Sequence, residues 1–202
     1  MEIDPSSLKR AEAYNLLCSL VVPRPIAWVS TLDADGRPNL APFSFFNAVT
    51  SDPPILMLSV GRRKGERKDT SANLVAIGEG VVHIPSRANA EQMVATSADF
   101  DAGIDEFSAC GLTAVPADLV KPPRVKEAPV AMEVKVSGHQ TLGNAPMDVF
   151  FLDILKFHID DEILSDSRVD ARKFDACGRL GGSEYCTTTD IYKIVRRTPE
   201  DI

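Results

Sequence analysis

Alternating and continuous apolar segments along the chain predict a series of β-strands. In residues 130–137 the even-numbered positions are apolar and most of the others polar or small, which is typical of a strand with one buried face. Residues 26–32, 81–84 and 148–159 are rich in β-branched and other apolar side chains and also predict strands. Residues 55–60 form a short continuous apolar run, which predicts a strand buried on both faces.

Three segments carry the spacing or the boundary residues of helices. Residues 6–20 have apolar side chains at an imperfect helical spacing, and the prolines that follow end the segment. Asp69 or Thr70 is predicted to be the N-cap of a second helix. Ser86 is predicted to cap a third helix, over residues 88–98.

The remaining segments are irregular. Residues 100–129 contain four prolines and predict a long covering loop with short helical turns, and residues 160–202 predict a looser tail. The sequence contains no internal repeat and no linker, so we expect a single domain (1–202) with a barrel core at about 20–160. Strands outnumber helices and short turns join them. The pattern therefore favours a mainly β fold, a closed or nearly closed antiparallel barrel with peripheral helices.

One predicted strand, residues 37–49, is unusual. Pro42 cannot donate to a strand ladder, so the strand lies at an edge or is bulged there. Ser44 and Asn47 are polar positions among three phenylalanines. The segment thus offers hydrogen-bonding groups within an aromatic wall, although phenylalanines at such positions are also ordinary core residues.

Composition and charge narrow the functional classes. The chain has a net charge of −7, which disfavours nucleic-acid binding. No apolar run reaches the roughly 18–20 residues that cross a membrane. The first residues are acidic and do not resemble a secretory signal. These features predict a cytoplasmic protein that does not enter the membrane.

The cysteines and histidines do not suggest a metal site. The four cysteines are far apart and contain no C-x-x-C pair, so we expect free thiols and no metal centre. The three histidines are isolated, and His83 is interpreted as a strand histidine with its polar edge satisfied. No arrangement of serine, histidine and aspartate and no glycine-rich nucleotide motif is present.

A basic segment opposes the acidic balance of the chain. Residues 61–68 carry five cations and one acid, and the helix predicted from Asp69 or Thr70 follows at once. Free backbone N–H groups at that helix start, together with Lys68 and the hydroxyl of Thr70, are suited to phosphate oxygens. The alternative is a solvated loop before an ordinary capped helix.

Five short motifs occur in order over residues 20–185 and resemble the flavin-reductase-like FMN-binding split-barrel family, in particular its flavoredoxin-like subgroup. They are Pro23-Arg24-Pro25-Ile26-Ala27-Trp28-Val29-Ser30-Thr31, Asn39-Leu40-Ala41-Pro42-Phe43-Ser44-Phe45-Phe46-Asn47, Asp52-Pro53-Pro54, Lys68-Asp69-Thr70, and Arg179-Leu180-Gly181-Gly182 with Tyr185.

The resemblance implies a split β-barrel of antiparallel, Greek-key type that forms a homodimer with one FMN per subunit near the interface. It implies that Lys68, Asp69 and Thr70 hold the phosphate, together with Ser59. The remaining implied residues run along the isoalloxazine ring, and they are Thr31, Ala41, Pro42, Phe43, Ser44, Phe45 and Asn47. Arg24 and Arg179 are either pocket-edge residues or local anchors.

The resemblance also implies hypotheses about the function. The leading hypothesis is an NAD(P)H-dependent flavin reductase that needs no catalytic side chain, because the flavin carries the chemistry. In many related reductases a Gly-Asp-His run precedes the late long strand, where this chain has Gly143-Asn144-Ala145-Pro146. That difference leaves the electron donor open. The alternatives are a flavoredoxin-like electron carrier serving a redox protein, and a barrel that binds haem or another ligand instead of flavin.

Overall fold

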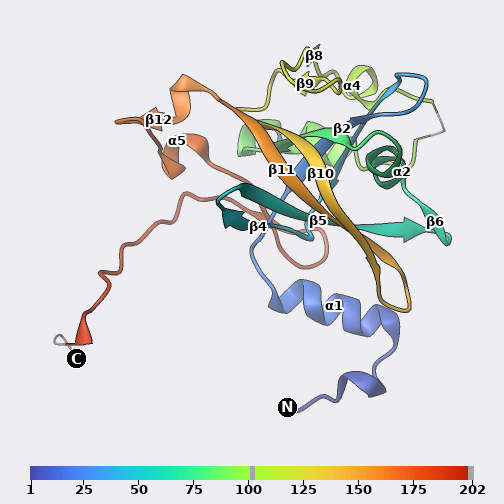
Figure 1. Cartoon of the computed structure of the whole chain (residues 1–202). Coiled ribbons are helices and arrows are strands. Elements are labelled where there is room, and N and C mark those ends of the chain that lie inside the picture. The colour runs from blue at the N-terminus through green and yellow to red at the C-terminus, as the bar shows by residue number, and fades with distance from the viewer. Residues whose placement is uncertain (101–102, 200–202) are drawn as a thin grey trace.

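The computed structural model describes residues 1–100 and 103–199, and its main feature is a strongly curled antiparallel sheet (Figure 1). The strand order is β3-β2-β7-β10-β11-β5-β4, with β6 paired to the end of β5. These strands are β2 (Ala27–Leu32), β3 (Pro38–Phe43), β4 (Phe46–Ser51), β5 (Pro54–Arg63), β6 (Glu66–Arg67), β7 (Glu79–Ile84), β10 (Val130–Leu142) and β11 (Met147–Ile159).

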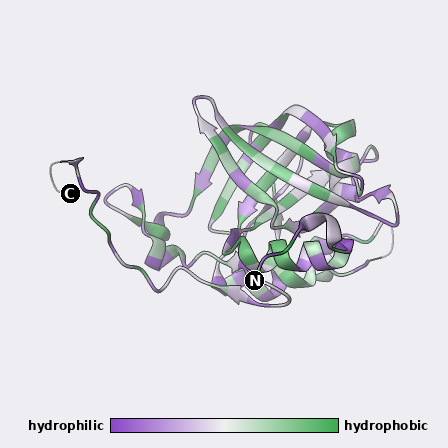
Figure 2. Cartoon of the chain, turned by 90° about the horizontal axis from the view of Figure 1, so that it is seen from below, coloured by the Kyte–Doolittle hydropathy of each residue, from purple (hydrophilic) through white to green (hydrophobic). Residues whose placement is uncertain are grey.

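Short elements surround this sheet. The helices are η1 (Pro5–Ser7), α1 (Arg10–Leu20), α2 (Asp69–Ala76), η2 (Arg87–Asn89), α3 (Ala90–Ala95), α4 (Glu106–Ala109), η3 (Asp161–Ile163) and α5 (Ala171–Phe174). The short strands are β1 (Arg24–Pro25), β8 (Ala114–Val115), β9 (Arg124–Val125), β12 (Leu164–Ser165), β13 (Arg168–Val169), β14 (Gly178–Arg179) and β15 (Tyr185–Cys186). Figures 1 and 2 show the last described residues reaching away from the barrel.

The two end strands of the sheet, β3 and β4, are consecutive in the chain and are separated only by Ser44 and Phe45. The Ser59 N–H of β5 donates at 2.8 Å to the carbonyl oxygen of Phe45, the residue just before β4. The sheet therefore curls until its ends meet at this connection. The prediction of a mainly β, antiparallel split barrel with peripheral helices is confirmed.

The barrel encloses an apolar core, and a second apolar cluster lies outside β2 and β3. Along the barrel strands hydrophobic and hydrophilic residues alternate (Figure 2). In the second cluster, Phe107, Leu112 and Val125 pack with Trp28 and Leu40. These three residues come from the irregular segment predicted at 100–129. That prediction of a covering loop with short helical turns is confirmed for residues 100 and 103–129, and residues 101–102 lie outside the described ones.

Two strands differ from their predicted burial. In β5, Leu56, Leu58 and Val60 are buried while the residues between them are half-buried, so the strand has one core face and not two. In β10, Glu133 is fully buried although it was expected on the outer face. Its carboxylate accepts hydrogen bonds from the backbone N–H groups of residues 118–120, and His158 contacts it at 2.6 Å. These bonds replace the water that the charge loses on burial.

The other boundaries were only partly predicted. The extended segment 37–49 is two strands, because the chain turns at Ser44–Phe45. Pro42 does lie in an edge strand, β3. The N-cap of α2 is Lys68, not Asp69 or Thr70. The third predicted helix is shorter than expected, since α3 ends at Ala95.

Within the described residues, no helix is both long enough and apolar enough to span a membrane. All four cysteines are free thiols, as expected. His83 is completely buried in β7, as a strand histidine with both ring nitrogens engaged. Its Nδ1 lies 2.9 Å from the Trp28 carbonyl oxygen, and its Nε2 accepts the Val125 N–H at 2.9 Å. Only the neutral ring can donate from Nδ1 and accept at Nε2.

His83 should therefore make the fold sensitive to acid. Burial lowers its pKa to about 4, so the unfolded chain, with an ordinary histidine pKa near 6.5, binds the proton more readily. The free energy of unfolding should fall by about 2 kcal/mol from pH 7 to pH 5 on this account. Urea unfolding at the two pH values measures it. His83→Gln should be less stable at pH 7 but lose most of this slope, and an unchanged slope would contradict the assignment.

Candidate functional site

The N-terminus of α2 is available for an anion. Lys68 is the N-cap, and the first backbone hydrogen bond at this end runs from the Ala72 N–H to the Lys68 carbonyl oxygen. The N–H groups of the three preceding helical residues therefore have no acceptor within the helix. The positive end of the helix dipole lies at the same place. This end of α2 is suited to a phosphate or carboxylate group.

A cavity of about 580 Å³ opens at this helix end, and its size is typical of small-molecule sites. Its walls come from β3, the β5–β6 hairpin, the start of α2, Thr96–Phe100 and the start of α4. A second cavity of about 460 Å³ lies between α3 and β15 and is lined mainly by apolar groups. None of the predicted site residues lines the second cavity.

Six of the eleven predicted site residues line the 580 Å³ cavity. They are Ala41, Pro42, Phe43, Lys68, Asp69 and Thr70. The first three form an apolar wall along β3, and the last three form the start of α2. The Lys68 ammonium lies 5.7 Å from the centre of the Phe43 ring, so the charged and the aromatic parts of the site are in contact. The structure thus brings the predicted phosphate end and part of the predicted ring wall together.

A buried polar seam supports the α2 side of the cavity. The Asn39 amide donates to the Thr70 hydroxyl at 2.9 Å, and the Asn73 amide donates to the Thr31 hydroxyl at 3.0 Å. Thr31 and Thr70 are 0% and 1% exposed. Thr31 therefore lies behind the cavity wall, where it fixes α2 against β2. Asn39 belongs to the predicted motif but was not predicted to bind, and it lines the cavity.

The other four predicted residues lie elsewhere in the subunit. Ser44 contacts the Arg24 guanidinium at 3.4 Å, and Phe45 stacks on Tyr14 of α1. Asn47 is exposed on β4, where its side-chain oxygen accepts the adjacent Ala48 N–H. Ser59 is half-buried on β5. None of the four lines the cavity, and their role stays a prediction.

Two carboxyl groups also face the cavity. Asp69 is the first residue of α2, and Glu106 of α4 accepts the Leu40 N–H at 3.1 Å. Burial raises the pKa of Glu106 above its ordinary value, and the nearby charge of Asp69 adds to this effect. Glu106 is thus easier to protonate than an exposed glutamate. Residues of this segment were predicted only as a covering loop.

Most of the cavity arginines are already paired. Arg63 forms an ion pair with Asp99 at 2.8 Å, and Arg37 forms ion pairs with Asp33 at 2.7 Å and Asp35 at 2.8 Å. Such exposed pairs contribute little stability, but they reduce the charge that is available to a ligand. Lys68 has no carboxylate partner among the described residues. It is therefore a cation free to pair with an anionic ligand.

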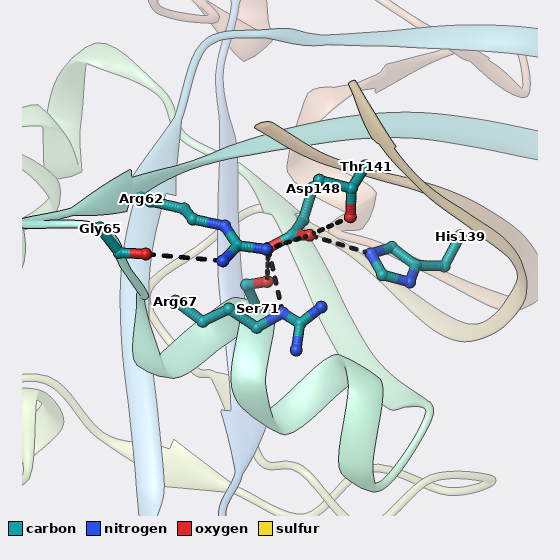
Figure 3. A network of polar contacts seen from close by, with 7 residues as sticks. All are labelled: Arg62, Gly65, Arg67, Ser71, His139, Thr141 and Asp148. Carbon is teal, nitrogen blue, oxygen red and sulfur yellow. Dashed lines mark hydrogen bonds and ion pairs between the residues drawn. The ribbon is translucent and has the colours of Figure 1, made fainter. Parts of the chain in front are cut away.

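A buried carboxylate, Asp148 of β11, lies on the other side of α2. It is 0% exposed and accepts hydrogen bonds from the hydroxyls of Thr141 at 2.8 Å and Ser71 at 2.9 Å (Figure 3). The Arg67 Nε at 3.2 Å, the His139 Nε2 at 3.2 Å and the Arg62 guanidinium at 3.4 Å complete the network. Burial alone would raise the pKa of Asp148, but these hydrogen bonds outweigh it and hold the pKa well below its ordinary value. Nothing in the sequence pattern had singled this residue out.

Arg24 and Arg179 are local anchors in this structure. Arg24 is buried and donates to the carbonyl oxygens of Cys18, Val21 and Leu180, which ties α1 to the C-terminal segment. Arg179 donates to the Tyr185 hydroxyl and to the Gly182 carbonyl oxygen. Neither arginine lines the 580 Å³ cavity.

One group of possible metal ligands occurs among the described residues. Oxygen and nitrogen atoms of Asp118, Glu133 and His158 lie within 4.8 Å of one another. The Glu133 oxygens already accept three backbone N–H groups, and Lys156 pairs with Asp118 at 2.5 Å. These contacts satisfy the group without an ion, so we assign it a structural role.

The chain belongs to the flavin reductase-like domain family, whose model matches residues 19–174. An uncharacterized protein of Aquifex aeolicus is 42% identical over 174 residues, 85% of this chain and 88% of that protein.

Several solved structures share the fold. Nitrilotriacetate monooxygenase component B from Bacillus cereus has a TM-score of 0.92 and 31% identity, covering 96% of this chain and 98% of that one. The 2-nitrobenzoate 2-nitroreductase NbaA of Pseudomonas fluorescens has a TM-score of 0.89 and 32% identity, covering 98% of both chains. Flavoredoxin of Desulfovibrio vulgaris (Miyazaki F) shares the fold at a TM-score of 0.74 and 24% identity, covering 99% of this chain and 98% of that one. The predicted resemblance to split-barrel flavin reductases and flavoredoxins is confirmed.

The Asp148 network should contribute strongly to stability. Asp148→Asn keeps the shape of the side chain but removes the charge that faces Arg62 and Arg67. We expect a loss of about 2–3 kcal/mol in the free energy of unfolding, since the Ser71 and Thr141 hydroxyls and the two guanidinium groups lose a charged acceptor. Urea unfolding at pH 7 measures it. Asp153→Asn on the same strand is the matched control, because Asp153 is half-buried and, among the residues that the structure describes, accepts a hydrogen bond from the Ser137 hydroxyl alone. Equal losses in both variants would contradict the special role of Asp148.

Proposed function

We propose that the chain binds FMN in the 580 Å³ cavity and acts as an NAD(P)H-dependent flavin oxidoreductase. The observation that carries this proposal is the joint position of Lys68, Thr70 and the α2 N-terminus at one end of a cavity with an apolar wall at Ala41–Phe43. Membership of the flavin reductase-like family supports it. The cavity offers the two features that FMN requires, which are hydrogen-bond donors for its phosphate and an apolar surface for its flat ring.

The residues of this chain would position the cofactor. Lys68, the Thr70 hydroxyl and the N–H groups of the first α2 residues, Asp69 among them, would bind the phosphate oxygens. The apolar groups of Ala41, Pro42 and Phe43 would lie along the isoalloxazine ring and exclude water from it. When bound, FMN supplies the hydride-accepting chemistry itself. We therefore assign no catalytic acid or base to a side chain.

The turn after β10 does not supply a histidine for nicotinamide handling. Residues 143–146 form that turn, and they contain no histidine. His139, the nearest one, lies against Asp148 and stacks on Phe150, with 4.6 Å between ring centres. Its ring therefore does not belong to the cavity wall. Electron transfer from a nicotinamide would depend on access to the ring face alone.

We also propose that the active form is a cytoplasmic homodimer. Tyr14, Leu17 and Leu20 of α1 are 57%, 54% and 69% exposed, so α1 carries an apolar surface that a second subunit can cover. Phe45 packs against Tyr14 on the same helix. The predicted ring-side residues Ser44, Phe45 and Asn47 would then lie close to the subunit interface and could reach a flavin there.

Two other functions make different predictions. A flavoredoxin-like carrier would hold FMN tightly and exchange electrons with a protein partner, not with a nicotinamide. A barrel that binds haem or another ligand would be isolated without flavin and would not take up added FMN. The likeness to a structure named 2-nitrobenzoate 2-nitroreductase leaves the electron acceptor of this chain open.

The reductase proposal predicts that NADH or NADPH bleaches the bound flavin. The purified protein should show a flavin absorption spectrum, and anaerobic addition of one of the two nicotinamides at millimolar concentration should reduce it. A stopped-flow spectrophotometer measures the rate. Dithionite is the control for a reducible flavin. If dithionite bleaches the flavin and neither nicotinamide does, the chain is a carrier and not a reductase.

The phosphate assignment predicts a loss of FMN affinity in Lys68→Ala combined with Thr70→Ala. Each charge-assisted hydrogen bond contributes roughly 1.5–3 kcal/mol, so we expect the dissociation constant to rise at least tenfold. Fluorescence titration with FMN measures it. Lys173→Ala, a lysine of α5 outside the cavity, is the charge control. Unchanged affinity in the double variant would place the phosphate elsewhere.

A further inference from the structure

Helix α2 has two polar sides, and the proposed function uses only one of them. Thr70 and Asn73 face β2 and β3 through Asn39 and Thr31. Ser71 faces the opposite way, toward Asp148 of β11, and Arg67 lies on the same side. The two sides therefore offer separate groups to a ligand at this end of the barrel.

The Asp148 side carries more positive charge than one carboxylate needs. Arg62 and Arg67 both pair with Asp148, and the two hydroxyls and His139 also contact it. A single carboxylate with one guanidinium and two hydroxyl donors would already be satisfied. The second guanidinium leaves this cluster with a net positive charge beside the cavity.

Arg67 presents this charge to the cavity. Only its Nε contacts Asp148, and its two terminal nitrogens have no hydrogen-bond partner among residues 1–100 and 103–199. Figure 3 shows these two nitrogens pointing away from Asp148. Arg67 lines the cavity, and its side chain is 37% exposed. A guanidinium held at Nε with both terminal groups free is suited to bidentate binding of a phosphate.

We propose that Arg67, oriented by Asp148, forms a second phosphate subsite in the cavity, which binds the further phosphate group of a dinucleotide. The inference rests on the proposed function, in which Lys68 and Thr70 hold the FMN phosphate on the other side of α2. Two dinucleotides have this chemistry: FAD, through its second phosphate, and the nicotinamide electron donor, through its pyrophosphate. Lys64 of the same hairpin also lines the cavity and adds positive charge at its rim.

The first phosphate site does not need Arg67. Lys68, the Thr70 hydroxyl and the free N–H groups of α2 already supply several donors to one phosphate. Arg63, the other hairpin arginine at the cavity, is paired with Asp99. Arg67 is thus the hairpin guanidinium whose terminal groups remain available, within the part of the chain described. Asp148 is a positioning residue here, since it acts through Arg67 and does not line the cavity.

The test compares ligands that differ in their number of phosphates. The dissociation constants of FMN and FAD are measured on apo-protein by fluorescence titration, and those of NAD⁺ and NADP⁺ on FMN-loaded protein by calorimetry. In Arg67→Gln we expect FAD or the nicotinamide dinucleotides to bind about tenfold more weakly, as loss of a charged hydrogen bond implies. The dissociation constant of FMN should change by less than about twofold. If only FAD binds more weakly to Arg67→Gln, the ligand of the second subsite is the flavin dinucleotide. If only NAD⁺ and NADP⁺ bind more weakly, its ligand is the nicotinamide electron donor.

Two variants serve as controls, and a third tests whether Asp148 positions Arg67. Arg67→Lys keeps the charge but not the bidentate group, so it should recover only part of the lost affinity. Arg168→Gln removes one exposed positive charge from β13 and should change no dissociation constant. Asp148→Asn, if folded, should weaken the same dinucleotide as Arg67→Gln does.

The outcomes separate this inference from the proposed function. If Arg67→Gln weakens FMN as much as the dinucleotides, Arg67 belongs to the first phosphate and the second subsite is refuted. If no dinucleotide changes, it is refuted as well, even where FMN binds normally. If the wild type does not bind FMN, the proposed function fails, and calorimetry of NAD⁺ and NADP⁺ on the apo-protein still decides whether Arg67 binds a dinucleotide.

Discussion

The burial of one negative charge, Asp148, constrains the whole end of the barrel that carries the site. A carboxylate without water must be met by donors, and its donors come from three separate parts of the chain. Thr141 and His139 belong to the partner strand β10, Ser71 belongs to α2, and Arg67 to the β5–β6 hairpin. Moving any of these segments outward would remove at least one partner from the buried carboxylate. The network therefore fixes the start of α2 and the basic hairpin relative to each other.

The opposite side of α2 is held by neutral hydrogen bonds instead. Thr31, Asn39, Thr70 and Asn73 form a seam between α2 and the β2–β3 pair, with both threonines buried. A shift of α2 along the strands would leave the buried threonine hydroxyls without these partners, so the seam opposes it. Because the charged network holds one side of α2 and this seam holds the other, the free N–H groups at the helix start stay in one position. A phosphate site built there is preorganised before any ligand arrives.

The sequence predicts local features well and long-range partners poorly. The basic segment, the following helix and the edge strand at Pro42 follow from residue types and spacing alone. Asp148 looks like a residue next to a turn, because its partners Ser71, Arg67 and Arg62 are 77, 81 and 86 residues away in the sequence. Glu133 was misplaced because the N–H groups that accommodate its charge come from residues 118–120, and residue spacing does not show that this irregular segment folds back onto β10. The wall from Thr96–Phe100 and Glu106 depends on how the covering segment folds back, which periodicity does not encode.

The remaining predicted residues lie apart from the groups that are suited to phosphate. The groups suited to phosphate line the cavity, whereas Ser44, Phe45 and Asn47 lie outside it. Of these three, Phe45 packs against Tyr14 on the exposed apolar face of α1. A flavin bound as proposed would therefore be held by its phosphate end in the cavity. Its ring end would be completed by whatever covers α1. In that proposal the groups that hold the phosphate are separate from those that surround the ring, and no acid or base of the cavity wall takes part in the chemistry.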